Sequence, residues 1–539
     1  MTDVRIIPLG GVREFGLNST AIETSQGAVL VDAGQMFPRY ASVGIDRIIP
    51  DFTYVVENQE AFEAIILTHS HEDHIGALPY LLKEAPIPMY GHPFTIEMVK
   101  RKLSEYEIDG GLTFHPVKAG QKISVAGLDI DFIDVEHSTI GCLALMFHTP
   151  QGIIVHSGDF RKTPAAYKDV PSPIRLFMCE STNAASEPRC VNETKALKNI
   201  DRIVKATSGM VVISTFASHV SRINALVEIA AKNNRRAAIV GRSMNQVVDI
   251  ATSTGYINLD TKTLLDPEIV TSTKKNKVMV ICTGTQGEIY SMLSLIAKGW
   301  HKIKVGLEDS VIISARMIPG NELAIGRCID RLLDYGAKVF YSETSEVHAT
   351  GHATHDEIKK AIDLLAPEIV MPIHGEFRQM KALSDMILTI PKIASQIVLP
   401  RPGQVWTLNA EGINITGDVP HGRCFVDGEL TGDIKDVVLR DRRHISEGGL
   451  VVAFVVLDGN SSNIITGPEV MCKGVVPAYM EQEIIDSVKQ KAREVLETSH
   501  DVDIDDVQSL QAYVKEELGR YLKLKLGKKP MVIPVIMEI

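Results

Sequence analysis

The sequence predicts an α/β protein with more than one domain. At 539 residues the chain is too long for a single hydrophobic core, and its 45% hydrophobic residues are enough for two or three cores. Short apolar runs that predict buried strands recur along the chain, and several of them end at a His or Asp residue. Amphipathic helical stretches alternate with such runs, which is the pattern of sheets covered by helices.

The stretch AIILTHSHEDHIGAL, which begins at residue 64, is the most informative part of the chain. Its apolar residues predict a buried strand that delivers His69, His71, Asp73 and His74 into a turn. His69 and His71 are two residues apart, so both can point the same way from extended backbone and hold one ion. Asp73 and His74 then face a neighbouring site, and two divalent ions at adjacent sites can support hydrolysis at phosphorus or at a carbonyl. The alternative is a polar loop with surface histidines.

Further candidate ligands stand at the ends of other strand-like runs. They are Asp32 in AVLVDAG, His137 in LDIDFIDVEHS, Asp159 in GIIVHSGDF and His374 in EIVMPIHGE. Open sheets place their sites where strands end, so we expect these side chains to converge with those of the first turn. Taken singly, each could instead be a cap or a satisfied polar group.

The candidate ligands stop at Asp159 and resume at His374, so we expect a large insertion between them. The insert alternates strand-like runs (MVVIST, AAIVG, KVMVICTG, SVIISA, KVFYS) with helical stretches, which predicts a second α/β domain. After GDIKDVVLRDRR the chain holds a β-rich run, two helical stretches and a final strand, PMVIPVIMEI. We expect a first domain in two parts, an inserted domain and an end domain, at residues 1–205 with 369–447, 206–368 and 448–539.

Composition limits the classes of protein that the chain can belong to. The formal net charge of −11 argues against coating nucleic acid by bulk electrostatics, but it does not exclude a nuclease, because bound cations can line a positive channel. Seven scattered cysteines without a CxxC pair predict neither a disulfide framework nor a thiolate zinc site. No apolar run approaches membrane-spanning length, and the first residues enter a strand without a leader-like segment. We therefore expect a cytoplasmic protein that does not enter a membrane.

The motifs resemble those of the metallo-β-lactamase superfamily, and the insertion resembles that of its β-CASP nucleases. The strings LGGVREFGLN, PQGIIVHSGDFR, TFASHVSRI, ICTGTQGE, VLRDRR and PVIMEI are similar to those of the ribonuclease J family and run along the whole chain. The resemblance implies a metallo-β-lactamase fold, an αββα sandwich, with an inserted β-CASP α/β domain and a small C-terminal α/β domain.

The resemblance also implies how two divalent ions are held. One ion would be bound by His69, His71 and His137, and the other by Asp73, His74 and His374. Asp159 would bridge the two ions, and Asp32 would orient a ligand from behind. Zinc is the expected ion, and the same imidazoles and carboxylates also accept manganese or magnesium.

The activity that the resemblance implies is 5′ to 3′ exonuclease cleavage of RNA, with endonuclease cleavage also open, in messenger RNA decay and ribosomal RNA maturation. The expected catalytic residues are Asp73, Glu180 and His352, and His352, oriented by Glu180, would give a proton to the leaving 3′ oxygen. Helix N-termini and hydroxyl groups bind phosphates. The expected contacts to single-stranded, 5′-monophosphorylated RNA are Ser218, His219, Ser221, Arg222 and Thr350. A homodimer or homotetramer is also implied.

The sequence departs from the usual pattern of this family at three positions. His219 stands where Asn is common, Thr350 where Ser is common, and Glu180 where Asp is common. None of these changes removes a metal ligand. His352 could alternatively be a buried structural histidine, and Ser218 an ordinary helix cap.

Two other classes of function stay open at this point. One is a small-molecule metallohydrolase, such as a lactonase or thioesterase, with the same metal ligands. The other is an inactive subunit that scaffolds an RNA-decay assembly. The insertion and the pair of Glu180 and His352 favour the nuclease, and the complete set of ligands weighs against an inactive subunit.

Overall fold

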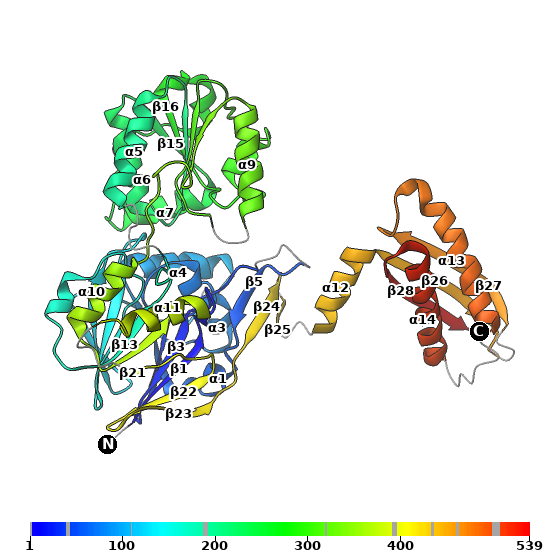
Figure 1. The fold of residues 1–539 in the computed structure, drawn as a ribbon, viewed down its shortest axis with the longest axis horizontal. Coiled ribbons are helices and arrows are strands. Elements are labelled where there is room, and N and C mark those ends of the chain that lie inside the picture. The colour runs from blue at the N-terminus through cyan, green and yellow to red at the C-terminus, as the bar shows by residue number, and fades with distance from the viewer. Residues whose placement is uncertain are drawn as a thin grey trace. The chain divides into compact units, whose positions relative to one another are not determined.

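The computed structural model describes residues 3–38, 44–108, 110–186, 192–317, 321–390, 396–428, 430–432, 436–459, 463–498 and 507–539 (Figure 1). Contacts divide the chain into two units. The first comprises Met1–Arg39 and Arg47–Cys424, and the second Tyr40–Asp46 and Phe425–Ile539. This division does not separate the inserted domain from the domain that surrounds it, so the expected limits near residues 205 and 368 stay predictions.

Two mixed sheets form the centre of the surrounding domain. The first has the strand order β23-β22-β1-β3-β4-β6-β7-β8 and the second the order β21-β19-β13-β12-β11-β10-β9. The first sheet consists of β1 (Val4–Gly10), β3 (Ser19–Glu23), β4 (Ala28–Val31), β6 (Phe62–Leu67), β7 (Met89–Gly91), β8 (Phe114–Pro116), β22 (Gln404–Asn409) and β23 (Gly412–Asp418). The second consists of β9 (Lys122–Val125), β10 (Leu128–Val135), β11 (Cys142–Thr149), β12 (Gly152–His156), β13 (Ile174–Glu180), β19 (Ile369–Ile373) and β21 (Gln396–Ile397).

Apolar side chains from both sheets pack into one core between them. Ile6 and Ile66 of the first sheet share this core with Phe132 and Leu145 of the second, and all four are almost completely buried. Removing a buried aromatic side chain such as that of Phe132 costs about 3–5 kcal/mol, because a cavity remains. The two sheets are therefore held face to face by side chains that alternate along each strand.

Helices cover the outer faces of the two sheets. Helices α10 (His355–Leu365) and α11 (Phe377–Ile387) pack on the second sheet through a separate apolar cluster. Helices α3 (Leu78–Glu84) and α4 (Pro93–Glu105) contact each other, and α4 packs against β7 and β8. The remaining short elements of this part are β2 (Val12–Arg13), β5 (Arg47–Pro50), α1 (Thr53–Glu57), α2 (Glu72–Ile75) and β20 (Gly375–Glu376). This layering is the αββα sandwich that the sequence predicts.

The inserted domain is a parallel sheet with helices on both faces (Figure 1). Its strand order is β15-β16-β14-β17-β18, with β14 (Val211–Ser214), β15 (Arg236–Val240), β16 (Val278–Cys282), β17 (Ser310–Ile313) and β18 (Lys338–Phe340). One face packs on α5 (Glu193–Ala206), α6 (Val220–Lys232) and α7 (Arg242–Ser253). The other packs on α8 (Met292–Ala297) and α9 (Glu322–Asp334). Because the strands are parallel, the loops that follow them all lie at one edge of the sheet.

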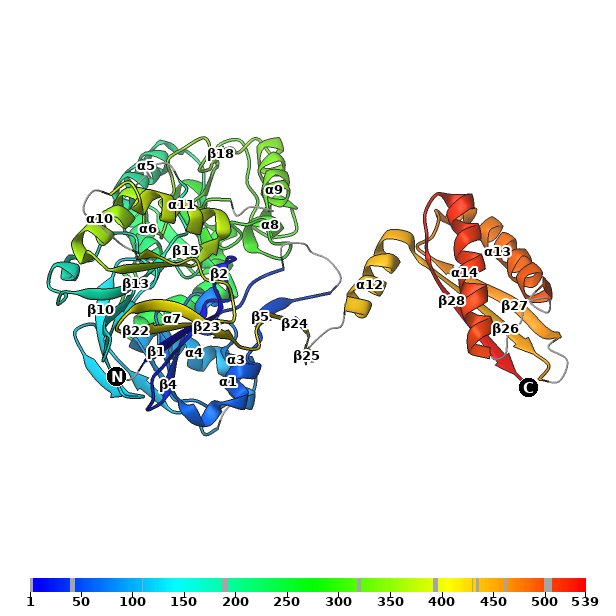
Figure 2. The same cartoon turned by 60° about the horizontal axis from the view of Figure 1, so that its bottom comes forward.

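The second unit contains a small sheet with the strand order β27-β26-β28. It is made of β26 (Leu450–Leu457), β27 (Ile464–Lys473) and β28 (Met531–Glu538), preceded by β24 (Arg423–Asp427), β25 (Leu430–Gly432) and α12 (Asp436–Gly448). Alternate residues of β26 are buried against α13 (Ala478–Thr498) and α14 (Val507–Leu526), which lie on one face of the sheet (Figure 2). The side chains between them point to the other face.

The expectations about membrane spans and cysteines can be compared with the described residues. Among these residues, no helix is both long enough and apolar enough to cross a membrane. The cysteines of the described part of the chain carry free thiols, while Cys190 lies outside it.

Candidate metal centre

The turn after β6 brings histidines directly from a buried strand into the site. Thr68 and His69 follow the strand, and His71 occupies the cap position of α2, a short helix that contains Asp73 and His74. His69 and His74 are almost completely buried. The rigid strand therefore fixes where this turn starts, and the helix fixes the spacing of its last two ligands.

The other predicted ligands arrive at the same place from the ends of their own strands. His137 follows β10, Asp159 follows β12 and His374 follows β19, and all three are buried. Asp32 follows β4, and its backbone has a φ of 60°, while that of His374 has a φ of 50°. This left-handed conformation is uncommon for residues other than glycine and is often found at functional sites. The structure thus brings together side chains that are up to 342 residues apart in the sequence.

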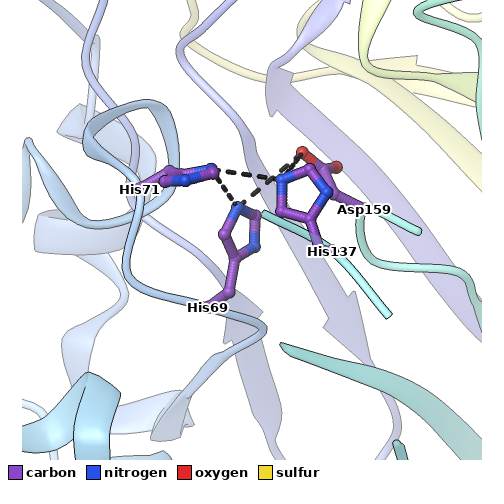
Figure 3. Close-up of side chains that lie close together, drawn as sticks. All are labelled: His69, His71, His137 and Asp159. Carbon is purple, nitrogen blue, oxygen red and sulfur yellow. Dashed lines mark hydrogen bonds and ion pairs between the residues drawn. The ribbon is translucent and has the colours of Figure 1, made fainter. Parts of the chain in front are cut away.

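The first cluster consists of His69, His71, His137 and Asp159, whose candidate ligand atoms all lie within 4.8 Å of one another. Nδ1 of His71 lies 3.1 Å from Nε2 of His69 and 3.2 Å from Nε2 of His137. Figure 3 shows the three imidazoles and the carboxylate pointing toward one another. This arrangement of nitrogen and oxygen donors suits a divalent cation such as zinc.

A second cluster adjoins the first and consists of Asp73, His74 and His374. Oδ2 of Asp73 lies 3.1 Å from Nε2 of His374 and 3.8 Å from Nε2 of His74. Asp159, His374, Glu180 and His352 form a third group within the same 4.8 Å limit. This third group shares Asp159 with the first cluster and His374 with the second, so the three groups adjoin one another.

Asp159 lies where the clusters meet. Its Oδ2 atom is buried and has no hydrogen-bond partner among the described residues. It lies 3.7 Å from Nε2 of His69, 3.4 Å from Nε2 of His74 and 3.8 Å from Nε2 of His137. Its Oδ1 atom lies 3.4 Å from Nδ1 of His374. A buried carboxylate oxygen without a partner is costly, and a cation held by these imidazoles would compensate its charge, so the residues fit a divalent metal site.

Hydrogen bonds from behind orient the candidate ligands. Asp32 accepts from Nδ1 of His74 at 2.7 Å and from the backbone N–H of Thr68 at 2.8 Å. The carbonyl oxygen of Gly351 accepts from Nδ1 of His137 at 2.6 Å. These two bonds leave Nε2 of His74 and of His137 as the nitrogen that faces an ion, which is the usual arrangement of a ligand histidine.

The protonation states of the three histidines in the first cluster suit metal binding. Burial lowers the pKa of His69 and of His137 well below the usual range, and it lowers the pKa of His71 to about 4. These imidazoles are therefore neutral near pH 7, as a metal ligand must be.

The acidic members of the centre are ionised for a different reason. Burial alone would raise the pKa of Asp159, but His374 and His74 lower it well below its usual value. The pKa of Asp73 is lowered by the same two histidines, again against the effect of burial. Burial would lower the pKa of His74, but Asp159, Asp73 and Asp32 raise it well above the usual value. A cation bound at His74 would therefore displace a proton.

His352 lies at the edge of the centre and contacts Glu180. Nδ1 of His352 is 2.9 Å from Oε2 of Glu180, whose side chain is fully buried. The other carboxylate oxygen, Oε1, accepts from the backbone N–H of Phe160 at 2.9 Å. Burial would lower the pKa of His352, but Glu180 and Asp159 raise it to about 9. His352 is thus a cation near pH 7 that can release a proton.

The residues expected at the RNA phosphate are spread over different environments. Ser218 and His219 lie in the turn before α6, where Ser218 is half-buried and His219 is buried, and Ser221 is exposed on the first turn of the helix. Oγ1 of Thr350 accepts from Nδ2 of Asn183 at 3.1 Å. The fifth residue, Arg222, is fully buried and forms an ion pair with Glu193.

Two residues at this site escaped the sequence analysis. Arg161 donates through Nε to the carbonyl oxygen of Thr350 at 2.9 Å, and Glu193 lies between Arg161 and Arg222. Arg161 stands two residues after Asp159 within the quoted string PQGIIVHSGDFR, so its position was a signal that could have been used. Glu193 is an ordinary acidic residue in the first turn of a helix, and such residues are common there.

Comparisons with known proteins cover nearly the whole chain. Family models match residues 29–212 (beta-lactamase superfamily domain), 208–332 (Ribonuclease J, beta-CASP domain), 342–393 (Zn-dependent metallo-hydrolase RNA specificity domain) and 437–539 (Ribonuclease J C-terminal domain). These matches confirm the predicted fold class, with its inserted and C-terminal domains. They also support binding of RNA and of a divalent metal by this chain.

Relatives of similar length are ribonucleases. Ribonuclease J 1 of Streptococcus pyogenes is 31% identical and is matched over 99% of this chain and 98% of its own length. Ribonuclease J2 of Bacillus subtilis is 31% identical and is matched over 100% of this chain and 99% of its own length. Ribonuclease J of Thermus thermophilus is 33% identical and is matched over 99% of this chain and 95% of its own length. A solved structure of a protein of unknown function from Enterococcus faecalis has a TM-score of 0.57 at 15% identity. It covers 76% of this chain and 100% of its own, and it shows similarity of fold alone.

Proposed function

The chain belongs to the ribonuclease J family and is a metal-dependent ribonuclease, and from this premise we propose that it degrades single-stranded RNA from a 5′-monophosphorylated end. Endonuclease cleavage is a second mode of the same site, and the processes served are messenger RNA decay and ribosomal RNA maturation. The observation that carries the proposal is the contact of His352 with Glu180 beside Asp159, because it adds a proton donor to a cluster of candidate metal ligands. A lactonase or thioesterase is not favoured by the matched families.

We propose two divalent ions, with zinc as the expected metal and manganese or magnesium as alternatives. His69, His71 and His137 would hold one ion, Asp73, His74 and His374 the other, and Asp159 would contact both. Asp32 would fix the orientation of His74. Two such cations, when bound, would stabilise charge on phosphoryl oxygens and lower the pKa of a water molecule.

The side chain of His352 supplies the proton that the reaction requires. Because Glu180 raises the pKa of His352 to about 9 and holds its Nδ1, the Nε2–H group is the proton donor to the leaving 3′ oxygen. Glu180 orients His352 although the family commonly has Asp at this position, since the longer side chain lies 2.9 Å from Nδ1 of His352.

The RNA path follows the edge of the inserted sheet where its parallel strands end. A pocket of about 800 Å³ lies there, and Thr215, Arg242, Thr285 and Tyr290 are among the residues that line it. Tyr290 is 83% exposed, so a base can stack on its ring, and Arg242 begins helix α7, whose N-terminus favours phosphate. A single strand can occupy this pocket without bulk positive charge on the protein.

The terminal phosphate would be bound where the turn before α6 approaches residue 350. We assign this contact to Ser218, His219, Ser221, Arg222 and Thr350. Ser218 and Thr350 carry hydroxyl groups, whereas the N–H groups of Arg222 are already engaged by protein partners, so Arg222 would support the pocket from behind.

The end domain would join copies of the chain into a homodimer or homotetramer. Val452, Phe454 and Val456 lie on the sheet face opposite α13 and α14, and Ile533 and Met537 of the neighbouring strand are 39% and 50% exposed. An apolar sheet face of this kind is stabilised when a second copy covers it.

The direct test uses one RNA labelled at its 5′-monophosphate and the same RNA labelled at its 3′ end. With divalent metal, the purified protein should release labelled mononucleotide from the first RNA at once. From the second RNA it should leave no ladder of fragments of intermediate length. Asp73→Ala should release no labelled mononucleotide. Fragments of defined internal length would show the endonuclease mode. Hydrolysis of a lactone or thioester without cleavage of RNA would overturn the proposal.

A further inference from the structure

The loop at residues 347–352 carries His352 and is held to the metal centre by its own backbone. The carbonyl oxygen of Gly351 accepts from Nδ1 of His137 at 2.6 Å, and the carbonyl oxygen of His352 accepts from Nδ2 of Asn183 at 3.2 Å. These two contacts fix the position of the loop, and with it the position of the proton donor His352.

Arg222 holds the same loop from the inserted domain. Its Nη1 donates to Nδ1 of His348 and to the carbonyl oxygen of Ser314, each at 2.9 Å, and its Nη2 donates to the carbonyl oxygen of Ala349 at 3.3 Å. Its Nε and Nη2 donate to the two carboxylate oxygens of Glu193 at 2.9 and 2.5 Å. Every N–H group of this buried guanidinium thus has a protein partner.

Arg161 holds the loop from the surrounding domain. Its Nε donates to the carbonyl oxygen of Thr350 at 2.9 Å, next to the carbonyl that Arg222 holds. Its Nη1 lies 3.8 Å from Oε2 of Glu193. Burial and the charge of Arg222 lower the pKa of Arg161, whereas Glu193 and Glu136 raise it. Two guanidinium groups therefore converge on one loop and repel each other.

Glu193 is the carboxylate that compensates both positive charges. It begins α5 and its side chain is 19% exposed, so it faces the two arginines with little screening by water. Without it, Arg222 would be a fully buried charge lacking its anion, which is strongly unfavourable, and the backbone contacts of both arginines would relax. No motif of the sequence analysis includes this residue.

We propose that Glu193 is a positioning residue of the ribonuclease reaction. It acts through Arg222 and Arg161, which keep the loop at 347–352 in the place where His352 can donate its proton. The inference rests on the proposed role of His352. It predicts a defect in turnover more than in RNA binding, because the loop is held at the reacting end of the substrate and not along the RNA path.

The test compares Glu193→Gln with the parent enzyme on 5′-monophosphorylated RNA. The substitution keeps the size of the side chain and removes its charge. We expect kcat to fall by about 10²-fold, the loss typical of a displacement of about 1 Å at a reacting group, with a smaller change in KM and with bound metal nearly unchanged. Glu193→Asp, which restores the charge, should recover part of kcat.

A matched control separates positioning from stability. Asp309 is a buried carboxylate paired with Lys275 at the opposite end of β17 from Ser314, so Asp309→Asn should lower the melting temperature while leaving kcat unchanged.

If Glu193→Gln does not fold, Arg161→Lys provides the second variant, since it keeps the charge but loses the contact to Thr350, and it should also lower kcat. Parental kcat in a folded Glu193→Gln enzyme, or a fall in kcat that tracks loss of metal, would overturn the inference. Full activity of His352→Ala would instead refute the proposed function on which it rests.

Discussion

Nδ1 of His352 lies 2.9 Å from Oε2 of Glu180, a carboxylate that is fully buried. The two residues are 172 positions apart in the sequence, and all five strands of the inserted sheet, β14 to β18, lie between them. The chain therefore passes through the whole inserted sheet before it supplies the second member of this pair.

Replacing His352 by Gln removes the proton donor while keeping a polar side chain of similar size. We expect kcat to fall by about 10²- to 10⁴-fold, the usual contribution of a general acid, and metal content to stay at the parental value. Steady-state cleavage of a labelled RNA and elemental analysis measure the two quantities. His355→Gln, three residues along the chain at the start of α10, is the control and should behave like the parent. Loss of metal in the His352 variant would assign that histidine to the metal ligands instead.

Replacing Asp32 by Asn should weaken metal binding without abolishing the site. Asn tolerates the left-handed backbone at this position, but it accepts less strongly from Nδ1 of His74. We expect the affinity for metal to fall by about 10- to 100-fold, so that activity returns when more zinc or manganese is supplied. Asp159→Asn should not be rescued in this way, because it removes the candidate bridging ligand. Asp129→Asn, in an exposed ion pair with Lys122, serves as the control.

Replacing Ser218 by Ala should reduce the preference for RNA with a 5′-monophosphate over RNA with a 5′-hydroxyl. A hydrogen bond to a charged group contributes about 1.5–3 kcal/mol, which corresponds to a loss of preference of about tenfold or more. The ratio of kcat/KM values on the two RNAs measures this, with Ser253→Ala at the end of α7 as the control. An unchanged ratio would show that Ser218 does not contact the 5′-phosphate, and His219 rather than Ser218 occupies the cap position of α6.

Protonation of His348 should make the inserted domain less stable in acid. Burial and Arg222 lower the pKa of His348 to about 3, from an ordinary value of 6.5. Between these values the unfolded chain binds a proton that the folded chain excludes, so this residue lowers the free energy of unfolding by up to about 1.4 kcal/mol for each pH unit below 6.5. His348→Gln should flatten the pH dependence, measured as hydrogen exchange of β14 and β17 between pH 6.5 and 5. If the free energy of unfolding falls equally with pH in the variant and in the parent, the assignment to His348 is wrong.

A charge on the open face of the end domain should disrupt the proposed assembly. Ile533→Asp places a carboxylate among Val452 and other apolar side chains of that face, so it should convert oligomers into smaller species. Light scattering with size-exclusion chromatography measures the mass in solution. Leu524→Asp is the matched control, because Leu524 is 83% exposed on α14 and lies outside this sheet face. A parental mass for both variants would place the interface elsewhere.

The clustering of the candidate metal ligands could be predicted from sequence because strands position them. The candidates lie at or soon after the ends of short apolar runs, and such runs form strands whose ends converge. The spacing of His69 and His71 added the geometry of a shared ion. The inserted strands were equally predictable, since parallel strands are buried on both faces and therefore appear as continuous apolar runs.

The role of Arg222 could not be predicted in the same way. In the sequence it follows Ser218 and Ser221 at a helix start, which favours a phosphate site. The structure shows that the same side chain points into the protein, where Glu193 pairs with it. One signal was available: Arg222 precedes Leu226 by four residues, so it lies on the apolar face of α6. Its partner is 29 residues away on another helix, and helical periodicity carries no information about such pairs.

The parallel pairing of β13 with β19, from Leu176 with Ile369 to Glu180 with Ile373, also constrains the order in which this sheet can form during synthesis. A growing chain emerges from the ribosome with its N-terminal part first, so β13 can pair with β19 only after the whole inserted domain has been made. His374, the last of the candidate metal ligands, directly follows that neighbour. A nascent chain therefore lacks the complete set of candidate ligands until translation has passed residue 374.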